Sequence, residues 1–258
     1  MPTVIYPAPI FGPVQSRRLG RSLGVNLLPP DGKLCSFDCV YCECGLNADH
    51  VPQAPMTSRA EVARELERRL VQMRESGETL DAITYSGNGE PTSHPEFKEI
   101  VEDTIALRDR YFPQAKVCLL PNATHIDRPK IYEAIQKLDK ACLKLDTVNA
   151  EYIELVDRPN ARYDLPRIID IMKSLNGRCV IQTMFMKGEW QGKSVDNTGD
   201  EYVLPWLEVV KAVAPSGVDI YTISRDTPGE GLKKASKQEL DHIAGLVQSL
   251  GIDAHAYY

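Results

Sequence analysis

The feature that most constrains the fold is a regular alternation of short apolar runs and amphipathic stretches along the whole chain. Longer stretches with helical periodicity lie between the apolar runs, and a strand followed by a helix, repeated about six times, indicates βαβ units around a parallel sheet. An open doubly wound sheet and a closed or partly closed barrel both fit this pattern. The runs with the length and composition of buried strands are residues 22–28, 81–86, 116–120, 141–146, 179–186 and 218–223.

Three of the predicted helices share one start signal, a serine followed three residues later by a glutamate. In such a capping box the hydroxyl and the carboxylate each accept a hydrogen bond from a backbone N–H that the first turn leaves free. Gly251 is a plausible end for the last helix, and a short strand is expected over residues 252–257. The three pairs are Ser58 and Glu61, Ser93 and Glu96, and Ser236 and Glu239.

Length and charge limit the class of protein. A chain of 258 residues that is 43% hydrophobic can form one sizeable α/β domain, and a net charge of −6 argues against a general nucleic-acid coat. A local basic run (Arg17, Arg18, Arg21 and Lys33) is either a solvated arm or an anion contact near the cysteine loop. The first residues lack the pattern of a signal peptide, and no run approaches the ~18 apolar residues of a membrane span. We therefore expect a soluble, cytoplasmic protein with no membrane partner.

Four of the seven cysteines stand within ten positions, which does not resemble a disulfide framework and indicates a metal or cluster site in a reducing compartment. Thiolates of Cys35, Cys39 and Cys42 can converge on one centre if the loop curls. Three ligands leave one coordination position open, whereas structural zinc takes four. Cys44 follows in a tight C-x-C arrangement and is interpreted as a non-ligand. The single cysteines Cys118, Cys142 and Cys179 lie in apolar runs and are interpreted as core residues.

The C-x3-C-x2-C spacing, with Tyr41 before the third cysteine, resembles the signature of the radical S-adenosylmethionine (SAM) superfamily. Residues 11–26 also resemble one branch of it, which contains uncharacterised iron–sulfur oxidoreductases and the synthases of the wyosine base in transfer RNA. The resemblance implies a [4Fe-4S] cluster on Cys35, Cys39 and Cys42, with SAM chelating the fourth iron and yielding a 5′-deoxyadenosyl radical that abstracts hydrogen from a substrate. It also implies a partial (β/α)6 TIM-like barrel as a single domain over 1–258, with an N-terminal arm at 1–21 and the cluster loop at about 29–46.

Residues at the predicted strand ends extend the resemblance to cofactor contacts. The segment Gly87, Asn88, Gly89 and Glu90 is similar to the superfamily's glycine–acid motif, in which backbone and acid hold the amino group of SAM, although Asn88 replaces its first glycine. Strand-end groups also reach ligands in such folds, and Gln182 adds polar atoms to an apolar run. The resemblance and these positions make the following residues candidates for cofactor binding: Tyr41, Gly87, Asn88, Gly89, Glu90, Asn122, Asp146 and Arg225.

Several aspects of function stay open at this point. A flavodoxin- or ferredoxin-like electron donor is expected, and the substrate is a small molecule, a protein or transfer RNA. The sequence identifies no catalytic residue for the substrate. The alternative function is a non-catalytic iron–sulfur or zinc-binding redox or sensor protein, for which the extra thiol of Cys44 is the supporting feature.

Overall fold

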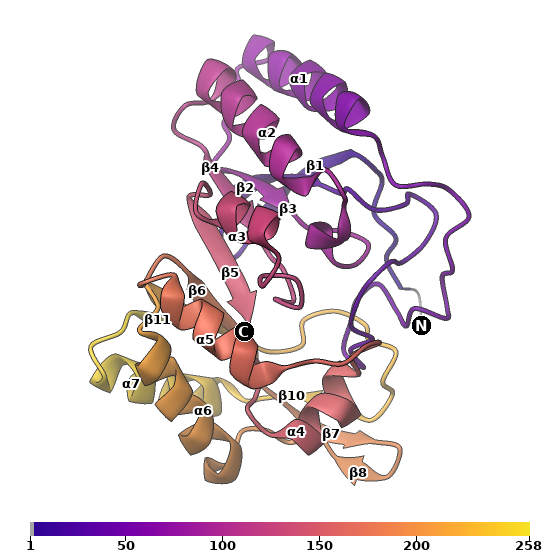
Figure 1. The fold of residues 1–258 in the computed structure, drawn as a ribbon. Coiled ribbons are helices and arrows are strands. Elements are labelled where there is room, and N and C mark those ends of the chain that lie inside the picture. The colour runs from indigo at the N-terminus through magenta and orange to yellow at the C-terminus, as the bar shows by residue number, and fades with distance from the viewer. Residues whose placement is uncertain (1–2) are drawn as a thin grey trace.

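The protein, described here over residues 3–258 by a computed structural model, is built around one curved sheet (Figure 1). Strands β2 to β11 of this sheet are parallel, and β1 pairs antiparallel with β2. Strands β1 and β11 are its two edges, so the sheet is a partial barrel, and all six predicted strands are present. The strands, in spatial order, are β1 (Ile10–Ser16), β2 (Gly20–Val25), β3 (Ala82–Tyr85), β4 (Lys116–Leu119), β5 (Lys140–Lys144), β6 (Val180–Met184), β9 (Gly217–Tyr221) and β11 (Ala254–Tyr257).

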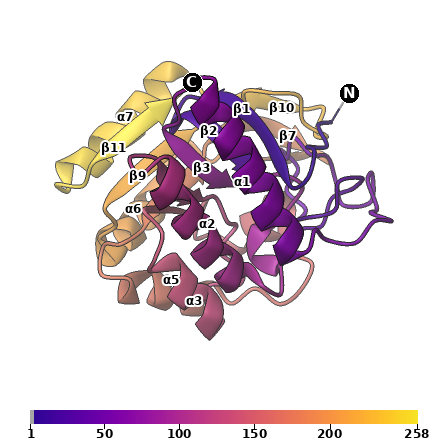
Figure 2. The same ribbon diagram turned by 90° about the horizontal axis from the view of Figure 1, so that it is seen from above.

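Helices follow the parallel strands and cover the outer face of the sheet. In Figures 1 and 2, α1 to α3 lie over the first strands and α5 to α7 over the later ones. A small sheet in the order β10-β7-β8 and the short helices α4 and η2 are found beyond the ends of β5 and β6. The remaining elements are α1 (Arg59–Glu75), η1 (Pro91–Ser93), α2 (Phe97–Tyr111), α3 (Pro129–Ile135), α4 (Ala150–Tyr152), the π-helix η2 (Ile153–Asp157), α5 (Leu165–Ser174), β7 (Met186–Trp190), β8 (Lys193–Ser194), α6 (Asp200–Val213), β10 (Leu232–Lys234) and α7 (Lys237–Ser249).

The two faces of the sheet differ in chemistry, and Gln182 was the one polar position within these strands that the sequence analysis singled out. Leu143 and Ile181 belong to the large apolar core beneath the helices. Their neighbours Lys144 and Gln182 are buried and polar, and they are Cα partners across β5 and β6, with Asp219 next in register on β9. Residues in register share one face of a sheet. The inner face of the barrel therefore carries a row of buried polar groups across β5, β6 and β9.

Two sequence-based predictions need correction. The predicted arm 1–21 includes β1, which pairs with β2 over Ile10 to Ser16. The predicted capping box at Ser93 is wrong, because α2 begins only at Phe97 and Ser93 closes the short η1 turn. The physical reason is Pro95, which favours an extended residue before it; His94 has φ −67° and ψ 128° and interrupts the helix.

The other two serines cap their helices, but only one of the two predicted boxes is complete. Ser58 accepts a hydrogen bond from the backbone of Glu61, and Ser236 forms the complete reciprocal box with Glu239. Gly251 follows α7 with φ +78°, as expected of a glycine after a helix end. Among residues 3–258, no helix is both long and apolar enough to cross a bilayer.

The contrast between the serines gives a test of the fold. Ser236→Ala should lower the free energy of unfolding by about 1 kcal/mol, because α7 loses its cap. Ser93→Ala is the matched control and should cost only a few tenths of a kcal/mol, since its hydroxyl has a single 3.3 Å contact with His125. Urea titrations of the two variants measure both values, and equal losses would contradict the assigned helix starts.

Candidate functional site

The cysteine loop, residues 29–46, lies between β2 and α1. On one side it is fixed by the glycine loop, residues 87–90, which follows β3. The backbone N–H of Leu34 donates to Asn88 O at 2.8 Å, and that of Glu90 donates to Leu34 O at 3.1 Å. Gly89 has φ +133°, and a Cβ at this position would stand 1.9 Å from Leu34 O. Only glycine permits this approach. The glycine motif therefore docks the residue immediately before Cys35.

On its other side the loop is fixed by the π-helix η2 and the residues after it. The N–H of Val40 donates to Val156 O at 2.9 Å, and the N–H of Asp38 donates to Asp157 O at 3.0 Å. π-Helical turns are rare in proteins overall, but those that occur often lie at functional sites. Residues 34–40 are thus held between the chain segments that follow β3 and β5.

Each of the three predicted ligands has polar neighbours. Asn122 Nδ2 lies 3.5 Å from Cys35 Sγ, and Asp157 Oδ1 lies 3.8 Å from Cys39 Sγ. Burial raises the pKa of Cys35 to about 12, whereas the adjacent Cys44 thiol is the main cause that lowers the pKa of Cys42 to about 6. Metal binding removes the proton from each of these thiols.

Lys33 places a buried positive charge within the cysteine loop. Its Nζ donates to Gly45 O at 2.6 Å. Burial opposes the charge, but the thiolates of Cys42, Cys35 and Cys39 raise its pKa. The sequence left open whether the basic run that includes Lys33 is a solvated arm or an anion contact near the cysteine loop, and for Lys33 the second alternative agrees with the structure.

These residues fit a [4Fe-4S] cluster held by three cysteines. The three cysteines have free thiols, and as whole residues they are partly exposed. Within residues 3–258, no three His, Cys, Asp or Glu side chains gather closely enough to bind a single metal ion. Thiolates that hold a cluster bind its different irons, so they need not meet at one atom. Lys33 offsets the negative charge of such a group.

Cys44 lies beside Cys42, the third predicted ligand. Its thiol is buried and points to Gly87 O at 3.4 Å. It thereby joins the cysteine loop to the glycine loop. The interpretation of Cys44 as a non-ligand stays a prediction.

The glycine–acid segment has more structural contacts than the sequence predicts. Asn88 is fully buried, and its amide nitrogen donates to Tyr6 O and Pro29 O, both at 2.9 Å. Glu90 is also buried; its carboxylate accepts hydrogen bonds from Thr92 and from the backbone of Asn122 at 2.6 Å. Burial raises the pKa of Glu90. Because a carboxylate has about four acceptor positions, the acid retains capacity for one further donor.

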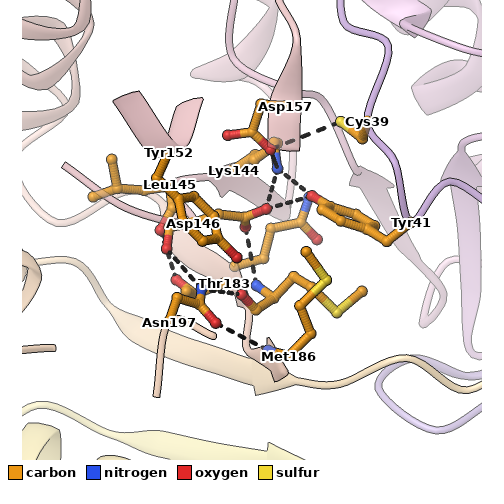
Figure 3. A network of polar contacts seen from close by, with 12 residues as sticks. Cys39, Tyr41, Lys144, Leu145, Asp146, Tyr152, Asp157, Thr183, Met186 and Asn197 are labelled. Atoms are coloured by element: carbon orange, nitrogen blue, oxygen red, sulfur yellow. Dashed lines mark hydrogen bonds and ion pairs between the residues drawn. The ribbon is translucent and has the colours of Figure 1, made fainter. Parts of the chain in front are cut away.

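A buried ion network joins the cysteine loop to the end of β5 (Figure 3). Lys144 Nζ forms ion pairs with Asp146 and, at 2.8 Å, with Asp157, and it donates to the hydroxyl of Tyr41. Tyr41 in turn donates to Asp146. Burial opposes the charge on Lys144, but the two carboxylates raise its pKa well above the usual value. All three ammonium donors are therefore satisfied.

The predicted site residues Tyr41 and Asp146 thus meet directly, and both also contact Lys144. The remaining oxygen of Asp146, Oδ1, accepts from Met184 N at 2.9 Å, so protein groups bind both carboxylate oxygens. A contact of Asp146 with ribose stays a prediction. Sequence reasoning missed Lys144 and Asp157, and the available signal was a lysine two residues before an aspartate within an apolar run.

Arg225 lies apart from this network. Its exposed guanidinium pairs with Glu43 Oε2 at 2.7 Å and donates to the hydroxyl of Tyr6. The carboxylate that Arg225 binds in the structure is therefore a protein group within the cysteine loop. Contact with a cofactor stays a prediction for this residue.

Lys144→Met should lower the free energy of unfolding by about 3–5 kcal/mol, because two buried carboxylates lose their cation. Lys173→Met is the matched control; its exposed pair with Asp170 should contribute less than about 1 kcal/mol. Urea titrations measure both losses. A small cost for Lys144→Met would show that the network is not a structural centre.

Known proteins share both the sequence and the fold. A protein described as GTPase Obg from Brachyspira hyodysenteriae is 27% identical over 237 residues, which is 90% of this chain but only 32% of that protein. The UPF0026 protein of Synechocystis is 30% identical over 233 residues, covering 86% of this chain and 78% of the relative. A solved radical SAM methyltransferase from Sphaerobacter thermophilus has a TM-score of 0.65 at 15% identity, covering 92% of this chain and 66% of the other.

The family assignment rests on a match that includes the cysteine loop, the glycine loop and the Lys144 network. The family model described as "Radical SAM superfamily" matches residues 30–190, more than half of the chain. Enzymes of this family use a [4Fe-4S] cluster and SAM. The curved parallel sheet agrees with their partial TIM-like barrel. This chain belongs to the radical SAM superfamily.

Proposed function

We propose that this enzyme cleaves SAM reductively and uses the resulting radical to abstract hydrogen from a substrate. The observation that carries the proposal is a loop with three free, partly exposed cysteines, held on both sides by backbone hydrogen bonds at the open end of the barrel. When bound, the cluster and SAM supply the electron transfer and the 5′-deoxyadenosyl group. The protein residues position these groups and shield them.

We assign the ligand role to Cys35, Cys39 and Cys42. Lys33 balances the charge of the thiolates from within the loop, and Asn122 lies beside Cys35. Asn122 also donates to Ser36 Oγ at 2.9 Å, which fixes the orientation of its amide. These contacts hold the ligands before any cofactor binds.

The cofactor would lie between the cysteine loop and the ends of β3 to β5. Glu90 is the acid for its amino group, because one acceptor position remains free beside Asn122. Tyr41 and Asp146 border the same region through their bonds with Lys144. Gly87, Asn88 and Gly89 contribute mainly by docking the loop, and Arg225 by holding Glu43.

The expected electron donor is a small flavodoxin- or ferredoxin-like protein, and we place the enzyme in the cytoplasm. A reducing compartment is supported by seven free cysteines, of which four are buried. Small molecules, proteins and transfer RNA remain candidate substrates. Whichever of these is the substrate, it must bring a C–H bond to the opening of the barrel.

Anaerobic reconstitution of the full chain should give about four irons per chain, and reduction should yield 5′-deoxyadenosine from SAM. Alanine at Cys35, Cys39 or Cys42 should abolish both iron loading and product. Cys44→Ala should keep the cluster, and Cys179→Ala, a core cysteine away from the loop, is the matched control. Iron analysis and chromatography measure the two outcomes.

A fully loaded cluster that never cleaves SAM would refute the proposed function. A colourless, zinc-loaded wild type that loses its metal in Cys44→Ala would instead favour the redox or sensor alternative.

Glu90→Gln should weaken SAM binding to the loaded enzyme about tenfold, because a charge-assisted hydrogen bond becomes a neutral one. The amide oxygen can still accept from Asn122 N, but the amide NH2 then faces the donors of Thr92, so a urea titration must show that the variant is folded. Glu133→Gln, in an exposed pair with Lys98, is the control. Equilibrium binding measures both affinities, and equal values would remove Glu90 from the cofactor site.

A further inference from the structure

Arg18 extends into the barrel, and it is not among the residues assigned above to the cluster or to SAM. From the turn between β1 and β2, its Nη1 donates to Gln182 Oε1 at 2.9 Å. Its Cζ lies 4.9 Å from the ring centroid of Tyr221. The adjacent Arg17 instead donates to Tyr258 O at the exposed edge of the sheet. Only one of the two arginines in this turn is therefore directed to the interior.

The inner face of the barrel offers no acid to Arg18. Lys144 is paired with two carboxylates, and Lys140 is paired with Asp219 at 3.0 Å. In the part of the chain that the structure describes, no carboxylate lies within 4.0 Å of the Arg18 guanidinium. Four of its five N–H donors remain for a ligand. A partly buried guanidinium with free donors is suited to a carboxylate or a phosphate, which it binds bidentately.

Two neighbours hold the guanidinium in place. Gln182 Nε2 donates to Pro121 O at 3.5 Å, which turns its Oε1 toward Arg18. The face of Tyr221 contributes a cation–π contact. The free donors are thus presented on a fixed plane, and a lysine could not reproduce that plane.

The position is accessible and close to the reacting region. Strands β1 and β11 are unpaired edges, and Arg18 and Tyr221 both retain solvent-accessible surface. Gln182, the partner of Arg18, is in register with Lys144 on β5. Tyr221 is in register with Met184, whose backbone N–H donates to Asp146 Oδ1. Both neighbours of Arg18 therefore lie next to the Lys144 network. A molecule held at Arg18 would meet this network.

We propose that Arg18 binds an anionic group of the substrate, a carboxylate or a phosphate, and holds it beside Tyr221. This names the substrate class for the reaction proposed above and rests on that proposal. Arg18 is a binding residue at the open seam of the barrel. The other end of the substrate then extends toward Cys39 and Tyr41.

The test uses the 15N-labelled, cluster-loaded chain in its oxidised form, with saturating SAM so that the carboxylate of the cofactor is already accounted for. Side-chain Nε–Hε resonances of Arg18 and Arg17 are assigned through bonds and checked by their loss in Arg18→Lys and Arg17→Lys. Inorganic phosphate and acetate are then titrated separately, with chloride holding the ionic strength constant. The Arg18 resonance should shift saturably, and Arg17, the internal control, should not.

A response to phosphate alone assigns a phosphate-bearing substrate, and a response to acetate alone assigns a carboxylate. In Arg18→Lys, the amide of Gln182 reports binding, and the affinity should fall at least about tenfold. If the chemical shift of Arg18 changes no more than that of Arg17 in both titrations, the inference is overturned. This result holds even if the lysine variant does not fold. The titration measures anion binding and does not depend on radical formation. The 5′-deoxyadenosine assay therefore tests the proposed function separately.

Discussion

The rest of the site depends on the buried charge of Lys144. Its ammonium group joins the end of β5 to Tyr41 in the cysteine loop and to Asp157 in η2. Removing an ammonium and two carboxylates from water costs several kcal/mol per ion, and only close pairing with complete hydrogen bonding offsets that cost. Because each partner comes from a different segment, the favourable geometry exists only when all three segments are in place. The network therefore specifies the position of the loop more than it adds to stability.

The open barrel explains why such a network can exist there. Helices cover the outer, apolar face of the strands, while the inner face carries Lys144, Gln182 and Asp219 in register. Polar groups on an inner face must be paired with one another or with a ligand. Most are paired within the protein, and Arg18 retains free donors. Ligands of parallel barrels bind at the carboxyl ends of the strands, which is where the cysteine loop lies.

The sequence predicted the features that depend on local pattern. The six strands and the end of α7 at Gly251 follow from periodicity and turn chemistry. It failed where a distant partner decides the outcome. Asn88 bonds Tyr6, which is 82 residues away, and Arg18 meets Gln182, which is 164 residues away. Neither pairing leaves a local signal, and at Ser93 a local signal was overruled by the following proline.

These long-range contacts also bear on how the loop takes its shape. In a small zinc domain the metal supplies the folding energy, and the ligands are unstructured without it. Here the backbone of Leu34 is bonded to the glycine loop and that of Val40 to η2, on both sides of the first two cysteines. Gly89 admits the first contact and Lys144 anchors the second through Asp157. The protein fold, rather than the bound cluster, therefore sets the shape of the ligand loop.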